Sequence, residues 1–282
     1  MTEIERRVAE LGPWYHCIDL GGGVKTKSEG FDPESKWRVI GSRLPEDMSG
    51  MSTLEIGCSS AYYSIKMAQR GARCVAFDHL QSAVDQAQFL ADHFKVGVTI
   101  ERRSIYDILE YKNQHFDFVI FMGVLYHCRY PMLVLDLLSD LDFDHLLLQT
   151  TTVNGLPAKE YDVYIDSQKA PLFENPDFPK MWFIEHRMRN DPTSWWMFNG
   201  SSVEAMLRAS GMTNIVRIKD EYWSCDKGIR PANGDVEYND ALNGIVKGVS
   251  GEIANRNDAV EQRLHDHLQK LEHQIARLQR NR

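Results

Sequence analysis

One stretch decides the fold: Leu54-Glu55-Ile56-Gly57-Cys58-Ser59-Ser60-Ala61. It joins a short apolar strand expected over residues 52–57 to a helix expected over residues 62–70. In parallel α/β sheets, ligands bind outside the carboxyl ends of the strands, and a glycine there lets the backbone approach a ligand closely. The stretch therefore indicates an α/β fold and also the place of its ligand site.

Strands and helices alternate further along the chain. Buried strands are expected at 73–78, 98–102, 116–122 and 145–151, and amphipathic helices at 80–94 and 131–141. Two late strands, at 214–222 and 242–249, read as an antiparallel hairpin and bring the total to seven. This alternation predicts a mainly parallel seven-stranded sheet of the Rossmann-like kind.

Three segments depart from this alternation of strands and helices. Residues 1–50 mix a short helix with glycine-rich loop and are expected to cover the site, while residues 51–250 hold the α/β domain. An insertion at 152–198, rich in proline and tryptophan, follows the fifth strand and has the length of a functional lid. The alternation resumes at Ser201-Ser202-Val203-Glu204, a capping-box pattern that predicts the start of a helix ending at residue 209.

Residues 251–282 are expected to form a C-terminal amphipathic helix. Its apolar seam is spaced 4, 3, 4 and 3 residues apart, at Leu264, Leu268, Leu271, Ile275 and Leu278. Such a short heptad seam fits either a helix packed on its own domain or one that forms a homodimer.

Composition narrows the class of protein. The 282 residues are 43% hydrophobic and 26% charged, as in globular proteins, and no apolar run is long enough for a membrane helix. The polar, acidic start predicts no secretory signal, and five cysteines without a Cys-x-x-Cys pair predict a reduced, cytoplasmic setting. The net charge of -8 disfavours tight nucleic-acid binding.

An acidic residue ends the second strand. Asp78 lies 21 residues after Gly57, where a carboxylate can accept hydrogen bonds from two ribose hydroxyls. The turn lacks the second and third glycines of a dinucleotide site, which disfavours an NAD-dependent oxidoreductase. Glu55 and Gly57 instead suit a nucleoside with a small charged tail, such as S-adenosylmethionine. A structural turn without a ligand remains the alternative.

The end of the fourth strand carries a more specific pattern. The run Met122-Gly123-Val124-Leu125-Tyr126-His127, followed by Arg129 and Pro131, resembles the corresponding motif of the tRNA wobble-uridine carboxymethyltransferase family and its small-molecule methyltransferase relatives. The resemblance covers roughly residues 31–150. It implies a class I methyltransferase fold and S-adenosylmethionine, or its carboxylated form, as cofactor.

The resemblance also implies roles for single residues. It implies cofactor contacts at Lys36, Gly57, Asp78, Ile105, Tyr106, Met122 and Tyr126. Glu55 and His79 are added as candidate cofactor contacts because they lie at the ends of the first two strands. Lys25 is a weaker match to a family lysine that binds the extra carboxylate.

Departures from the family bear on the reaction. Ser59 and Ala61 replace later motif glycines, and no arginine near the C-terminus matches the one that holds the carboxylated cofactor. With the acidic net charge, these departures favour plain methyl transfer to a small molecule or saccharide-like acceptor. Methyl or carboxymethyl transfer to a tRNA wobble uridine and a non-catalytic cofactor-binding assembly module remain alternatives.

Tyr126 and His127 are the candidate catalytic residues, because either could take a proton from the acceptor. Packing at the strand end is the alternative for His127. The candidate acceptor contacts are Lys25, Arg129, Trp182, Trp196 and Asn199, and for the lid residues a secondary core under the long loop is equally plausible. No credible set of metal ligands is found, so no metal is expected.

Overall fold

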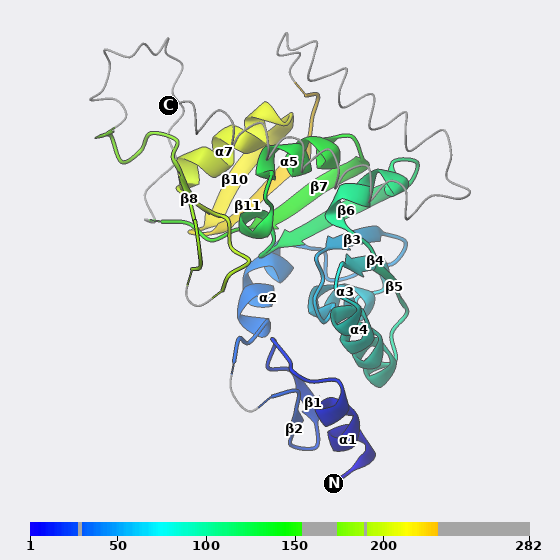
Figure 1. The fold of residues 1–282 in the computed structure, drawn as a ribbon. Helices are drawn as coiled ribbons and strands as arrows, with labels where there is room; N and C mark the ends of the chain where they lie inside the picture. The colour runs from blue at the N-terminus through cyan, green and yellow to red at the C-terminus, as the bar shows by residue number, and fades with distance from the viewer. Residues whose placement is uncertain (28–29, 154–173, 189–190, 231–282) are drawn as a thin grey trace, which may run out of the picture. The chain divides into compact units, whose positions relative to one another are not determined.

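A seven-stranded sheet organises the chain in a computed structural model, which describes residues 1–27, 30–153, 174–188 and 191–230. The strand order is β10-β11-β7-β6-β3-β4-β5 (Figure 1). The strands are β3 (Ser52–Ile56), β4 (Arg73–Asp78), β5 (Val98–Arg102), β6 (His115–Met122), β7 (Asp142–Gln149), β10 (Met212–Lys219) and β11 (Tyr222–Lys227). The predicted seven-stranded Rossmann-like sheet is confirmed.

The sheet is parallel except at one edge. Strands β5, β4, β3, β6 and β7 run parallel, whereas β11 is antiparallel to β7 and to β10. The direction in which strands are added reverses between β3 and β6. The chain begins at β3 in the middle of the sheet, adds β4 and β5 on one side, and then returns to add β6 on the other side of β3. Ligands bind at such a switch point in open α/β sheets.

The late hairpin differs from the prediction. Its strands are β10 and β11, which Asp220 and Glu221 connect, so Tyr222 begins the second strand rather than ending the first. The predicted strand at 242–249 lies outside the described residues, as does the predicted helix at 251–282 with its proposed dimer contact. The prediction failed because Asp220-Glu221 lacks the glycine or asparagine that marks most tight hairpins.

Helices cover the sheet in the expected places. Those of the sheet domain are α2 (Glu34–Ile40), α3 (Tyr62–Ala68), α4 (Gln81–Phe94), α5 (Pro131–Ser139) and α7 (Gly200–Ala209). Three 3₁₀ segments join them: η1 (Gly41–Arg43), η2 (Ile105–Tyr111) and η3 (Leu125–His127). No helix within the described residues is long and apolar enough to cross a membrane.

The N-terminal segment and the insertion add small elements. Helix α1 (Glu3–Glu10) precedes a hairpin of β1 (Asp19–Gly21) and β2 (Val24–Lys25). In the insertion, β8 (Met181–Phe183) pairs antiparallel with β9 (Trp196–Phe198), while residues 154–173 lie outside the described part. Met1–Pro231 form one compact unit.

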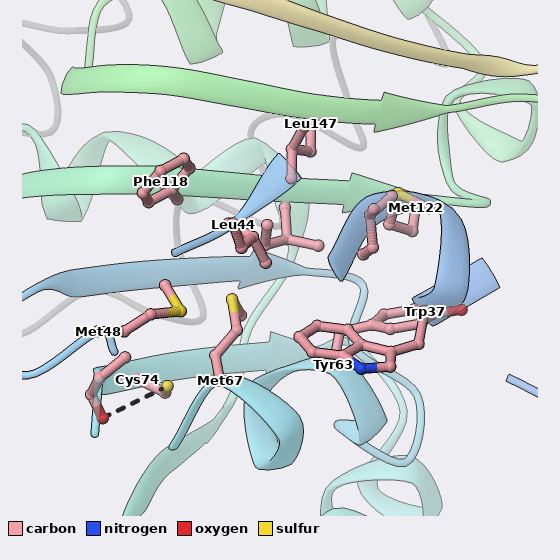
Figure 2. Close-up of a cluster of buried hydrophobic side chains, with 12 residues drawn as sticks. Trp37, Leu44, Met48, Tyr63, Met67, Cys74, Phe118, Met122 and Leu147 are labelled. Carbon is pink, nitrogen blue, oxygen red and sulfur yellow. Dashed lines mark hydrogen bonds between the residues drawn. The ribbon is translucent and has the colours of Figure 1, made fainter. Parts of the chain in front are cut away.

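One face of the sheet packs against α2 and α3. Alternate β6 residues Phe118, Ile120 and Met122 lie in a buried cluster with Trp37 of α2 and Met67 of α3 (Figure 2). Alternation arises because successive strand side chains point to opposite faces. This cluster holds α2 against the carboxyl half of β6, where the candidate site begins.

Truncating a side chain in this cluster is expected to destabilise the fold. Met67 is fully buried, so Met67→Ala is expected to lower the free energy of unfolding by about 2–5 kcal/mol through lost burial and a residual cavity. Urea denaturation measures this change. Met181→Ala is the control, because the Met181 side chain is exposed and should cost less than about 0.5 kcal/mol. Equal costs would contradict the described core.

Candidate functional site

The turn after β3 has an unusual backbone. Gly57, Ser59 and Ala61 have φ values of 63°, 49° and 52°, all in the left-handed region. Glycine adopts this region freely, whereas serine and alanine adopt it at a cost. The turn therefore keeps a glycine-type path at the two positions where the expected motif glycines are replaced.

The Glu55 carboxylate is one of two that hold this turn in place. The Glu55 carboxylate accepts hydrogen bonds from the backbone N–H of Ser64 (2.7 Å) and from its hydroxyl, which anchors the first turn of α3. Burial raises the pKa of Glu55 to about 7, although the Ser64 hydrogen bonds oppose the shift. Glu55 therefore supports the turn, and the cofactor contact expected of it from the sequence stays a prediction.

Asp78 ties the turn to the end of β4. Its Oδ2 accepts from the Ser59 N–H (2.9 Å) and its Oδ1 from the Leu80 N–H (3.0 Å). Each carboxylate oxygen has a further lone pair, so hydroxyl donors can still bind. The neighbouring His79 is exposed, with Nδ1 3.4 Å from Asp78 Oδ1. Asp78 thus keeps the ribose-binding capacity expected of it.

A chain of polar groups links α2, the carboxyl end of β7 and the β10–β11 connection. Lys36 Nζ donates to Gln149 Oε1 (2.6 Å), and Gln149 Nε2 donates to Glu221 Oε2 (3.1 Å). Burial lowers the pKa of Lys36 to about 8, while Glu221 opposes the shift. A Cβ on Gly123 would lie 3.2 Å from Lys36 Nζ and 3.8 Å from the Tyr126 hydroxyl. Lys36 therefore stands at this edge with donors left for an anion.

The N-terminal segment reaches the same turn. His16 is buried, and its Nδ1 lies 2.7 Å from the Ser60 hydroxyl oxygen. Burial, with a smaller contribution from the Lys36 charge, lowers the pKa of His16 to about 3. Tyr15 stacks on Phe31 at 5.9 Å between ring centroids. Sequence reasoning did not single out Tyr15 or His16, because no motif surrounds them.

Tyr126 and His127 follow β6 in η3, with 4.1 Å between their ring centroids. His127 Nδ1 lies 3.2 Å from the Thr193 carbonyl oxygen and 3.0 Å from its hydroxyl. Burial lowers the pKa of His127 and raises that of Tyr126 to about 12. The two candidate catalytic residues are thus adjacent, and the described end of the insertion packs on them.

The other expected cofactor residues divide into two groups. Tyr106, in η2, is half-buried beside the 128–130 loop, and burial raises its pKa to about 12. Ile105 precedes it and is also half-buried, so both remain candidates for an adenine contact. Met122 is buried in the cluster under α2, which gives its side chain a packing role at the edge of the site (Figure 2).

The expected acceptor residues are not all available. The Arg129 guanidinium lies 4.2 Å from the Trp195 ring centroid, and its carbonyl accepts from the Trp196 indole (3.2 Å). Trp182 is partly exposed on β8. Arg129 therefore contacts the described part of the insertion through Trp195 and Trp196, while Trp182 lies in the β8–β9 hairpin of that insertion.

Asn199 corrects two predictions. It is buried, and its side chain accepts from the backbone N–H groups of Ser202 (2.9 Å) and Lys180 and donates to the carbonyls of Pro176 and Phe178. It is thus the N-cap of α7, which begins at Gly200, in place of the predicted capping box at Ser201. With both amide donors and its oxygen in use, Asn199 has no free group for an acceptor.

Lys25 lies elsewhere. It lines a cavity of about 480 Å³ beside β1 and α3, together with Asp19, Glu34 and Tyr62. Among the described residues it has no recorded contact with the group around Lys36 and Asp78. Lys25 is therefore placed at this cavity, and its expected role in binding a carboxylate stays a prediction.

One group within the described chain has the spacing of metal ligands. It consists of His115, Asp117 and Asp144 at the amino ends of β6 and β7, the opposite edge from the turn after β3. Asp117 Oδ2 already accepts from the Ser52 backbone and hydroxyl groups. This group is not part of the candidate site.

Comparison with known proteins identifies the class. Residues 47–178 match the family model described as a methyltransferase domain. The N-terminal domain of EvdMO1, in a structure with SAH bound, superposes with a TM-score of 0.53 at 18% identity, covering 79% of this chain and 94% of that one. Residues 47–178 are thus similar to a methyltransferase domain, and the chain has the class I methyltransferase fold.

Curated relatives carry a more specific description than the family model does. The tRNA U34 carboxymethyltransferase of Helicobacter pylori (strain G27) is 30% identical over 128 residues, which are 44% of this chain and 48% of that protein. The enzyme of the same description from Campylobacter hominis is 31% identical over 112 residues, or 39% of each chain. The chain therefore spans about half the length or less of these relatives.

Substituting Gly57 is expected to distort the turn. A Cβ there would meet Val124 Cγ2 at 2.6 Å, in addition to the cost of the left-handed backbone. Gly57→Ala should lower the free energy of unfolding by about 1–3 kcal/mol. Gly50→Ala is the matched control, since Gly50 also has positive φ but open space around a Cβ. Thermal unfolding that shows equal losses would contradict the described contact.

Acid should weaken the contact between the N-terminal segment and the turn. The unfolded chain binds a proton at His16 near pH 6.5, whereas the folded protein does so only near pH 3. The free energy of unfolding should fall as the pH drops through this window, by about 1.4 kcal/mol per pH unit from this group.

His16→Asn should flatten that acid dependence, which urea titrations between pH 4 and 7 can measure. His186→Asn is the control, because the His186 side chain is 82% exposed. An unchanged slope in His16→Asn would show that His16 is not a buried neutral group.

Proposed function

We propose that the chain is an S-adenosylmethionine-dependent methyltransferase that acts on a small-molecule or saccharide-like acceptor. The observation that most supports this proposal is the turn from Gly57 to Ala61, which keeps a glycine-type backbone and is hydrogen-bonded to the Asp78 carboxylate. The methyltransferase family match over residues 47–178 and the fold shared with a protein that has SAH bound support this proposal.

The donor set suits this cofactor. Asp78 would accept from ribose hydroxyls, the half-buried Ile105 and Tyr106 would flank adenine, and the Lys36 ammonium would bind the amino-acid carboxylate. The bound cofactor would supply an electrophilic sulfonium methyl group. The protein would then align the acceptor with this methyl group, exclude water and remove a proton from the acceptor. Tyr126 and His127 are the candidate groups for the proton transfer.

Transfer to tRNA is the second candidate, because the curated relatives are described as tRNA U34 carboxymethyltransferases. The net charge of -8 and the partial coverage favour the small acceptor. Gel shift with total tRNA at two salt concentrations separates the two, since phosphate contacts give steep salt dependence. A tight, salt-dependent shift would favour the tRNA candidate.

The cofactor proposal predicts a defined loss in one variant. Titration calorimetry with S-adenosylhomocysteine should show saturable binding to the wild-type protein. Asp78→Asn should weaken binding about 10- to 100-fold, because hydrogen bonds to a charged group contribute roughly 1.5–3 kcal/mol. Asp85→Asn, on the exposed face of α4, should bind as wild type. Absence of wild-type binding, or unchanged affinity in Asp78→Asn, would overturn the proposal.

A further inference from the structure

The His127 ring is held by a short hydrogen-bonded series from the insertion. The Thr193 hydroxyl donates to Asp191 Oδ1 (2.6 Å), and the same hydroxyl oxygen lies 3.0 Å from His127 Nδ1. The Thr193 carbonyl oxygen lies 3.2 Å from that nitrogen. Asp191 itself is fixed by the Thr193 N–H and the Ser194 hydroxyl.

These contacts determine which ring nitrogen carries the proton. A carbonyl oxygen only accepts hydrogen bonds, and the proton of the Thr193 hydroxyl is already given to Asp191. Both groups facing Nδ1 are therefore acceptors, so Nδ1 is protonated and donates to them. In the neutral ring the lone pair is then on Nε2, for which the described residues supply no recorded hydrogen-bond partner.

We infer that His127, oriented by Thr193 and Asp191, is the general base that takes a hydroxyl proton from the acceptor through Nε2. This inference rests on the proposed function and deepens it, because it names the group that takes the proton from a hydroxyl of the proposed saccharide-like acceptor. Asp191 and Thr193 are positioning residues, since they act through His127. Sequence reasoning assigned no role to either.

The reaction balances with these groups. The acceptor oxygen forms a bond to the methyl carbon as the methyl–sulfur bond breaks with its electron pair left on sulfur, and Nε2 takes the hydroxyl proton. The positive charge thus passes to the imidazole. The Asp191 carboxylate, with Oδ2 3.8 Å from Nδ1, stabilises that charge. No oxidant, metal or other co-reactant is needed.

The groups around His127 also favour it over Tyr126. Burial lowers the pKa of His127, with smaller contributions from His79 and Lys36, whereas the Thr193 carbonyl and Asp191 raise it, and the net shift is downward. The imidazole is thus largely neutral at pH 7 and able to accept a proton. Burial raises the pKa of Tyr126 to about 12, so its phenol stays protonated and is a poor base.

Nitrogen NMR of the full chain tests the inference without turnover. In ¹⁵N-histidine-labelled protein, the His127 signals, assigned by their loss in His127→Gln, should show a proton on Nδ1 and none on Nε2 at pH 7.5. The pKa of His127 should lie below 6.5. Asp191→Asn should lower that pKa further because the neighbouring anion is removed, and Thr193→Val should weaken the preference for the Nδ1 proton.

His145 is the internal control. Its Nδ1 pairs with Asp226 Oδ1 at 2.7 Å on β7 and β11, so its signals should be unchanged in both insertion variants. A proton on Nε2 of His127, or no response to either substitution, overturns the inference. S-adenosylhomocysteine binding, measured on the same sample by calorimetry, separates the two failures: binding with the wrong tautomer leaves the proposed function intact, whereas no binding overturns that function directly.

Discussion

The site depends on two buried carboxylates that hold the turn between β3 and α3. Glu55 binds the first turn of α3 and Asp78 binds the Ser59 amide, so the turn is fixed at both ends. This support offsets the backbone cost of left-handed conformations at Ser59 and Ala61. Without glycines at those positions, the path of the turn is imposed by its neighbours rather than allowed by its own residues.

The same edge collects groups from distant parts of the chain. Lys36 comes from α2, Gln149 from β7 and Glu221 from the β10–β11 connection, and they form one hydrogen-bonded series. The N-terminal segment joins through His16 and the insertion through Thr193. A conformational change in either segment would therefore alter the candidate site, because His16 contacts Ser60 of the turn and Thr193 contacts His127.

The parallel part of the sheet could be predicted because its central strands are short apolar runs, as in Phe116–Met122, that alternate with segments of helical spacing. The β10–β11 hairpin could not, because its turn lacks a recognisable sequence signal. Asp78 and Tyr126 could be placed at the carboxyl edge for the same reason. Gln149 could also have been found, since it is a polar residue that follows the apolar run of Leu146–Leu148 at the end of β7. The insertion has no periodicity, so Thr193 and Asp191 had no signal, and Asn199 was read as a ligand group when it caps a helix.

The measurement that tests the account most directly is a crystal structure of the protein with S-adenosylhomocysteine. The account predicts the ribose against the Asp78 carboxylate, the amino-acid part over Gly57 within reach of Lys36, and the sulfur directed toward Tyr126 and His127. A nucleoside bound elsewhere, for example in the cavity lined by Lys25 and Tyr62, would contradict it.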